Sequence, residues 1–264
     1  MAVNKMEKKL KKIKICQSVY GNDLCTMDES SLMDVDLHAL ENFYMEKGEK
    51  HQKSLSKFMN FWEQDGYEKL FNPSARILSF TKDEAINIFG KGFMEVNESV
   101  DRIVMSVWTI GGTLEQSGSA LMSTTGSLMT GYLLDVTGSI ALYEMHAMLI
   151  EWIQSKIALP ANRYINGEFY PGMGSMRQDL MEKVVSVGDT ERLIGVSASG
   201  NSLLRPRKSQ CSFLSLGSAE NAVLVREEPC HPCSGKKCLY YQLGGCHMLE
   251  SKKGLPDNLI SSER

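Results

Sequence analysis

Four cysteines near the C-terminal end have the clearest potential for chemistry in this 264-residue chain. Segment 230–246 reads CHPCSGKKCLYYQLGGC and spaces its cysteines as C-x2-C-x4-C-x7-C. A two-residue spacer curls the chain back on itself, so that Cys230 and Cys233 can hold one metal centre. Cys238 and Cys246 follow closely enough to complete it. The spacing therefore predicts a metal site with four thiolate ligands.

Two metal centres fit this pattern. One is a structural zinc ion held by all four cysteines, and the other is an iron–sulfur cluster with four thiolate ligands. Lys236 and Lys237 would offset the thiolate charge, and His231 or His247 could replace one cysteine. Zinc ribbons usually separate two C-x2-C pairs by a longer span, so the spacing favours iron–sulfur. The alternative is a cysteine-rich tail that stays reduced and holds no metal.

The other three cysteines are expected to be unpaired thiols. The N-terminal segment 1–16 is rich in lysine and lacks the apolar core of a secretory signal, which predicts a cytoplasmic location. Disulfides are rare in that reducing compartment. Cys16, Cys25 and Cys211 are therefore predicted to be structural residues without a disulfide or a metal.

Composition and missing motifs narrow the function further. The formal net charge of −3 does not suggest a nucleic-acid-binding protein. The sequence contains no P-loop, no G-x-G-x-x-G after a strand, no G-x-S-x-G and no H-E-x-x-H. Glu144 and His146 lie two positions apart on an expected helix and point to different faces, so they are not expected to act as a pair. No catalytic acid, base or nucleophile is predicted.

Segment 127–158 is the most apolar stretch and predicts a long helix. Ionisable residues interrupt it, so a buried helix of a globular domain is expected rather than a membrane span. Gly131, Gly138 and Ala141 would let another element approach its backbone closely. No membrane partner is predicted.

Hydrophobic periodicity and turn residues predict a mixture of helices and strands around that helix. A solvated basic arm is expected at 4–14, with further helices at 30–46, 51–71, 82–90, 113–121 and 175–187. Strands are expected at 75–81 and 101–113, in the segments LIGVSAS and QCSFLSLGS, and in AVLVRE. The order lacks a regular β-α-β repeat, which favours the α+β class.

Four segments, taken in order, resemble the reactivation domain of cobalamin-dependent methionine synthase, in its stand-alone form. They are RIVMSVWTIGGTLEQ (102–116), GYLLDVTGSIALYEMHAMLIEWI (131–153), GEFYPGMGSM (167–176) and LLRPRKSQCSFLSLG (203–217). The last is similar to the family's M-x-P-R-K-S-V-S-x-x-x-G-L-G segment, and the third lies where the family has R-x-x-P-G-Y-G. The resemblance covers about 75–217, and some stand-alone relatives also end in a cysteine-rich segment.

The resemblance implies a fold, a ligand and a partner. The family fold is α+β, with a twisted antiparallel sheet and a long buried central helix. The family domain binds S-adenosylmethionine and docks on a corrinoid protein whose cobalt has reached the inactive cob(II)alamin state. A flavodoxin or ferredoxin supplies an electron, and the methyl group then moves from S-adenosylmethionine to cobalt.

Residues of two segments are implied to form the ligand groove. Its floor would be a tight turn, and a cationic segment would lie across from it. The turn comprises Glu168, Phe169, Tyr170, Pro171, Gly172, Met173 and Gly174, and the facing segment comprises Arg205, Arg207, Lys208 and Ser209.

The chain departs from the family at the ligand carboxylate. The family places an arginine three positions before the Pro-Gly pair, where this chain has Glu168, and Met173 replaces the tyrosine after it. Arg163, Arg205 or Arg207 could compensate. Because Glu168 occupies the position of the family's cation, a Glu168→Arg substitution is expected to tighten S-adenosylmethionine binding. In the alternative interpretation, the turn is purely structural and the ligand site is lost.

These observations predict three regions and two candidate functions. The regions are a basic arm at 1–29, an α+β domain at 30–218 and a metal-binding tail at 219–264. The leading function is a stand-alone reactivation partner of a corrinoid methyltransferase, with S-adenosylmethionine as a possible methyl donor. The alternative is an iron–sulfur electron-transfer or docking protein for the same complex that no longer binds S-adenosylmethionine. A non-catalytic subunit with structural zinc is a third option.

Overall fold

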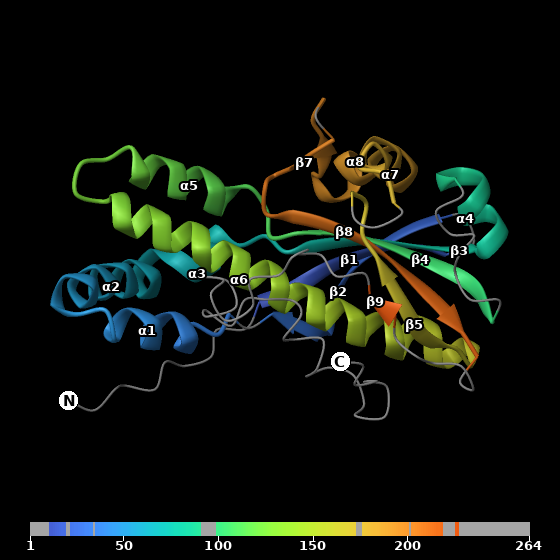
Figure 1. The fold of residues 1–264 in the computed structure, drawn as a ribbon, viewed down its shortest axis with the longest axis horizontal. Helices are drawn as coiled ribbons and strands as arrows, with labels where there is room; N and C mark the ends of the chain where they lie inside the picture. The colour runs from blue at the N-terminus through green and yellow to red at the C-terminus, as the bar shows by residue number, and fades with distance from the viewer. Residues whose placement is uncertain are drawn as a thin grey trace.

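A seven-stranded mixed sheet organises the molecule (Figure 1). The computed structural model describes residues 11–19, 22–33, 35–90, 99–172, 176–200, 202–218 and 225–226. The strand order is β2-β1-β3-β4-β8-β5-β9. The strands are β1 (Lys11–Val19), β2 (Asn22–Met33), β3 (Ser74–Thr81), β4 (Val100–Thr109), β5 (Tyr164–Phe169), β8 (Ser209–Gly217) and β9 (Val225–Arg226). Two further short strands, β6 (Ser197–Ala198) and β7 (Leu204–Arg205), pair separately.

Helices lie on both faces of this sheet. The longer ones are α1 (His38–Met45), α2 (Glu49–Phe61), α4 (Lys82–Phe89), α5 (Thr113–Met122), α6 (Leu128–Ile153) and α7 (Leu180–Gly188). Shorter turns are η1 (Trp62–Gly66), α3 (Tyr67–Leu70), η3 (Gln154–Ala158), η4 (Leu159–Ala161) and α8 (Thr190–Ile194). Figure 1 shows α5 beside α6, whereas α7 and α8 gather near β7.

Alternation along the central strands divides the core in two. In β4, Val104 and Trp108 join the core that includes α6, which we call the α6 face. Met105 and Val107 join the core that includes α4, α7 and α8, which we call the α8 face. Because both faces are covered, the strand is apolar at nearly every position, as in the sequence IVMSVW. The strands expected at 75–81 and 101–113 and the helices expected at 82–90 and 113–121 are confirmed as β3, β4, α4 and α5.

The sheet is not purely antiparallel, which corrects the expected architecture. Strand β1 pairs parallel with β3, and β5 pairs parallel with β9, while β3, β4, β8 and β5 form an antiparallel series. The structure is thus a mixed α/β arrangement compatible with the α+β class. The long buried central helix is confirmed.

Helix α6 is enclosed by protein. The segment Leu128–Ala161 is long and apolar enough to cross a membrane by length and composition, yet 72% of its most apolar window is buried inside the fold. The predicted close approaches are also confirmed. A Cβ on Gly131 would lie 2.7 Å from the carbonyl oxygen of Gly118, and one on Gly138 would lie 2.7 Å from Leu114 Cδ2.

The N-terminal part differs from the sequence expectation. Residues from Lys11 onward do not form a solvated arm, because β1 lies between β2 and β3 and its Ile13 and Ile15 are buried. The helix expected at 30–46 is also shorter, since β2 extends to Met33 and α1 begins at His38. Alternating lysine and isoleucine, K-I-K-I, is the strand pattern that the lysine content obscured.

Two cysteines correct the expectation of unpaired thiols. Cys16 and Cys25 lie directly opposite each other in the β1–β2 pair and form a disulfide. Cys211 is a free, buried thiol, as expected.

Candidate functional site

Glu168 is buried beneath α6. It is opposite Leu214 in the antiparallel β5–β8 pair, and opposite residues point to the same face, so its side chain enters the α6 face. Glu168 has no exposed surface, and its Oε1 lies 2.6 Å from His146 Nε2. The carboxylate predicted to face a ligand therefore contacts an imidazole in the protein core.

An aromatic ring fixes that imidazole. The His146 ring stacks on Trp108, with centroids 5.1 Å apart and planes inclined by 14°. Trp108 Nε1 donates to the carbonyl oxygen of Leu142, one turn earlier in α6, at 3.2 Å. The Tyr170 hydroxyl lies 3.5 Å from His146 Nε2 and is also buried. Imidazole, carboxylate and phenol thus form one buried cluster, which we call the His146 cluster.

Two serine hydroxyls line the same face of the sheet. Ser106 in β4 lies opposite Ser212 in β8, between the rows that contain Trp108 and Leu214. Both serines are buried, and neither Oγ has a hydrogen-bond partner among the described residues. An unsatisfied buried hydroxyl costs about 1–3 kcal/mol. These two hydroxyls give the α6 face spare hydrogen-bonding capacity near the His146 cluster.

The chemistry of the His146 cluster is limited by its burial. Imidazole, carboxylate and phenol are groups that can transfer protons. His146, Glu168 and Tyr170 are all at least 97% buried, so no atom of the cluster offers a broad surface to a substrate. What the cluster does in this conformation is fix the end of β5, and the turn that follows it, to α6.

The turn after β5 is only partly described. Phe169 points to the α8 face, Pro171 is buried, and Gly172 adopts a positive φ of +86°, a conformation that glycine tolerates in a tight turn. The Gly172 N–H donates to the carbonyl oxygen of Met176 at 3.0 Å. Met173 and Gly174 lie outside the described residues.

The predicted cationic segment lies at the same end of the sheet as this turn. Strand β5 runs antiparallel to β8 and ends at Phe169 opposite Phe213, and β8 begins four residues earlier, at Ser209. The structure therefore brings the ends of both predicted segments to one edge.

The cations of that segment are already paired with acidic residues. The Arg207 backbone N–H donates to Glu115 Oε2 and its Nε donates to Glu115 Oε1, both at 2.7 Å. Lys208 Nζ lies 3.1 Å from Asp135 Oδ2 and donates to Ser139 Oγ at 2.8 Å. A ligand carboxylate would have to compete with Glu115 and Asp135.

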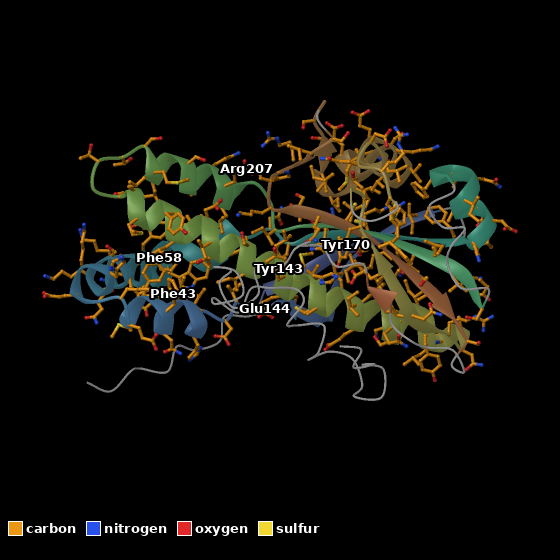
Figure 2. All side chains as sticks on the ribbon, in the orientation of Figure 1. Phe43, Phe58, Tyr143, Glu144, Tyr170 and Arg207 are labelled. Atoms are coloured by element: carbon orange, nitrogen blue, oxygen red, sulfur yellow. A yellow bond between two sulfur atoms is a disulfide. The ribbon has the colours of Figure 1, made fainter. Side chains whose placement is uncertain are left out.

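Arg205 and Ser209 complete the predicted set. Arg205 Nη1 lies 3.9 Å from Glu115 Oε1, which is the longest ion-pair contact of this segment to that carboxylate. Ser209 Oγ donates to Thr109 Oγ1 at 2.8 Å. Figure 2 labels Arg207 near α5 and Tyr170 farther along α6, so the engaged cation and the turn tyrosine come from separate parts of this edge.

Sequence reasoning did not identify the contact between His146 and Glu168. The two residues are 22 positions apart, and only the packing of α6 on β5 brings them together. The available indication was an ionisable residue in the most apolar helix, because such residues are buried only with a partner.

The predicted metal ligands Cys230, Cys233, Cys238 and Cys246 lie outside the described residues. Within the described part of the chain, no group of three or more His, Cys, Asp or Glu side chains is arranged to hold a metal. The tail remains a sequence prediction.

Comparisons with known proteins add no family assignment. Neither a protein-family model nor a curated protein sequence matches this chain.

Proposed function

We propose that this chain is a stand-alone partner of a corrinoid methyltransferase and acts when the corrinoid cobalt must be reduced from cob(II)alamin. The sequence resemblance suggests the partner and the chemistry. The described arrangement is compatible with it, because a long buried helix crosses the sheet and the two segments that resemble the family's ligand groove end at one edge.

Of the two versions of this function, the structure favours the one without S-adenosylmethionine. This choice rests on one observation: the side chains expected near the ligand carboxylate are already paired with other side chains of the protein. Glu168 is buried against His146, and Arg207 and Lys208 are paired with Glu115 and Asp135. Recognition of an amino-acid carboxylate needs a charged donor, and forming it here would first break one of these ion pairs.

In this version the chain docks on the corrinoid protein and supports a one-electron reduction. Cob(II)alamin gains one electron and becomes cob(I)alamin, which then takes a methyl cation from the methyltransferase's own methyl donor. The electron comes from a flavodoxin- or ferredoxin-type protein, directly or through an iron–sulfur cluster held by Cys230, Cys233, Cys238 and Cys246. A colourless, zinc-containing tail would leave only the docking role.

The partner can be tested by following cobalt. The affinity-tagged full chain is recovered from its own cells under anaerobic conditions, and cobalt in the eluate is measured by mass spectrometry. We expect cobalt to co-elute in proportion to the chain, together with the visible spectrum of a corrinoid. An eluate without cobalt, at the same yield of the chain, would contradict the proposal.

The ligand can be tested separately by calorimetry with S-adenosylmethionine. The wild-type chain should show no saturable heat, and Arg207→Gln should behave identically. Binding that Arg207→Gln abolishes, while Arg177→Gln leaves it intact, would support the version with S-adenosylmethionine instead. Arg177 is a suitable control because it is an exposed arginine paired with Asp179.

A further inference from the structure

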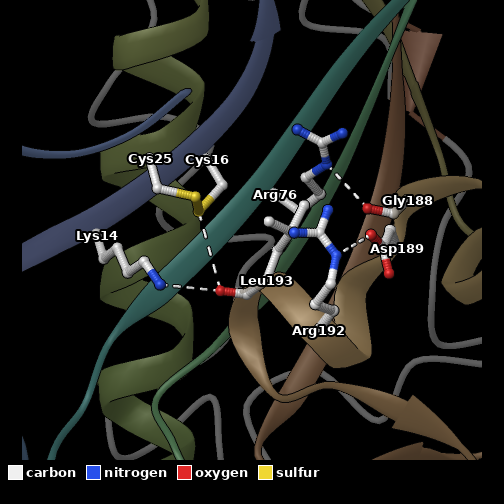
Figure 3. Close-up of a disulfide and its surroundings, with 8 residues drawn as sticks. All are labelled: Lys14, Cys16, Cys25, Arg76, Gly188, Asp189, Arg192 and Leu193. Atoms are coloured by element: carbon white, nitrogen blue, oxygen red, sulfur yellow. Dashed lines mark hydrogen bonds and ion pairs between the residues drawn. A yellow bond between two sulfur atoms is a disulfide. The ribbon is translucent and has the colours of Figure 1, made fainter. Parts of the chain in front are cut away.

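Cys16 and Cys25, which form a disulfide, differ in their exposure to solvent. Cys16 has no exposed surface, whereas Cys25 on the neighbouring strand is exposed. Figure 3 shows the bond joining β1 to β2 on the side of the sheet where α8 lies. A dissolved thiol can therefore approach this bond from the Cys25 end only.

Two basic side chains lie on the same face of the sheet as Cys16, the buried cysteine of the disulfide. Lys14 precedes Cys16 by two positions in β1 and so shares its face of the sheet, and Arg76 is directly opposite Cys16 in the parallel β1–β3 pair. Arg76 is only 3% exposed, which keeps its charge in a medium where screening by solvent is weak. Lys14 and Arg76 therefore place two basic side chains on the same face of the sheet as the buried Cys16 sulfur.

Backbone carbonyl groups of α7 and α8, the helices that pack on this face of the sheet, accept hydrogen bonds from these two cationic side chains. Lys14 Nζ donates to the carbonyl oxygen of Leu193 in α8 at 2.9 Å, and Arg76 Nε donates to that of Gly188 at 2.9 Å (Figure 3). Cys16 Sγ lies 4.0 Å from the same Leu193 oxygen. The carbonyl that anchors Lys14 is thus also within reach of a reduced Cys16 thiol.

We propose that Cys16–Cys25 is a redox-active disulfide that exchanges with low-molecular-weight thiols, with Cys25 as the attacked sulfur and Cys16 as the leaving group. An external thiolate forms a bond to Cys25 Sγ, the bond between the two cysteines breaks, and Cys16 departs as a thiolate on the face of the sheet that carries Lys14 and Arg76. Thiol exchange is faster when the leaving thiolate is stabilised in this way.

A second external thiol completes the reduction. Its thiolate attacks the external sulfur of the mixed disulfide and releases the Cys25 thiolate. Two external thiols thus become one external disulfide, and the protein gains two electrons and two protons. The Cys16 thiol can then donate to the Leu193 carbonyl oxygen.

The site of attack can be mapped on the oxidised full chain. The protein is treated under native conditions with limiting 2-mercaptoethanol, quenched in acid, and mapped by peptide mass spectrometry. We expect the mercaptoethanol adduct on Cys25. Cys211 serves as an internal control, because a free thiol cannot form a mixed disulfide with reduced mercaptoethanol without an oxidant, so an adduct there would report disulfide scrambling. An adduct mainly on Cys16, or reduction that requires unfolding in urea, would overturn the proposal.

The role of the charge can be tested by substitution of Lys14. Lys14→Met should slow native reduction by about three- to tenfold, and Lys14→Arg should restore most of the rate. The matched control is Lys53→Met, which removes the same charge from an exposed position on α2. An unchanged rate in Lys14→Met would exclude the assigned leaving group. If Lys14→Met does not fold, the rate of Lys14→Arg and the adduct position decide the matter.

Discussion

At the residue scale, the contact between His146 and Glu168 ties the end of β5 to α6. A carboxylate without exposed surface is tolerated in a protein core only when partners compensate its lost hydration. The imidazole supplies one such partner at 2.6 Å, and Trp108 holds the ring in place by stacking. Removing the imidazole should therefore cost more than its own packing contributes.

We expect His146→Phe to lower the free energy of unfolding by about 3–5 kcal/mol, as for other buried charges deprived of a partner. Phenylalanine preserves most of the stacking on Trp108, so the loss reports on the contact with Glu168. Denaturant titration measures the change, with Glu191→Gln on the exposed surface of α8 as a control near zero. A His146→Phe midpoint equal to that of the wild type would show that the contact contributes nothing.

The burial of Glu168 also changes what is expected of Glu168→Arg. The sequence suggested that this substitution would restore a ligand-binding cation. Because the side chain is buried against His146, arginine would instead place an uncompensated charge in the core. This substitution therefore tests stability and not ligand affinity, which is why the calorimetric test above uses Arg207.

At the element scale, Gly118 in α5 and Gly131 in α6, which lie where the two helices contact each other, allow a matched comparison of glycine-to-alanine substitutions. A Cβ on Gly131 would lie 2.7 Å from Gly118 O and from Met122 N, whereas a Cβ on Gly118 would meet Gly131 O at an ordinary 3.5 Å. Gly131→Ala should destabilise the fold by about 1–3 kcal/mol through overpacking. Gly118→Ala should be neutral or stabilising, because alanine favours a helix by about 1 kcal/mol. Equal thermal midpoints for the two variants would contradict this.

An ion pair ties the start of β4 to the residue before β5. Arg163 Nη2 lies 2.6 Å from Asp101 Oδ2, and the hydrogen bond, aided by the charge of Arg163, lowers the pKa of Asp101. The unfolded chain then binds a proton before the folded one as the pH falls. The stabilisation is complete above the ordinary aspartate pKa and disappears as the pH drops through the lowered value.

Arg163→Met should consequently lower the urea midpoint slightly at neutral pH, and the difference from the wild type should shrink toward pH 3. The effect is small because both side chains are partly exposed. Urea titrations at several pH values measure it. A difference that grows in acid would show the opposite linkage.

The helices and strands that sequence predicts best here are those whose pattern is local. Helix α4 has a capping box formed by Thr81 and Glu84, and β4 has an unbroken β-prone sequence, so both were placed almost correctly. Strands β1, β2 and β5 were missed. In β1 the lysines suggested solvent, but Lys14 instead satisfies the Leu193 carbonyl oxygen across the layers, and that contact exists only in the tertiary structure.

The candidate site shows the same limit. The sequence brought the turn after β5 and the cationic segment together, and the structure does end both at one edge of the sheet. It did not reveal that Glu115 and Asp135 engage Arg207 and Lys208, because those acids lie on helices far away in sequence. Pairing across 73 and 92 residues depends on how α5 and α6 pack, not on any local pattern.

At the scale of the whole molecule, the parallel pairing of β1 with β3 determines where the folded unit begins. The sequence suggested that residues 1–29 are an arm and that the domain starts at residue 30. In the structure, β1 separates β2 from β3, and Ile13 and Ile15 belong to the core of the α6 face. Deleting 1–29 would remove an interior strand together with its buried side chains.

We therefore expect a chain that begins at residue 30 to lose cooperative unfolding. The loss of Ile13 and Ile15 alone removes about 3–6 kcal/mol of stabilisation from hydrophobic burial. This amount is comparable to the total free energy of unfolding of many domains. A chain that begins at residue 11 is the matched control, since it keeps β1, and it should retain the circular dichroism spectrum and a single thermal transition. Urea titration of both chains measures the difference. If the chain from residue 30 unfolds with the same midpoint as the control, β1 contributes no stability and the arm interpretation would be correct after all. If only the control folds, the seven-stranded sheet is one cooperative unit from its N-terminal strands onward, and the Cys16–Cys25 disulfide lies inside that unit.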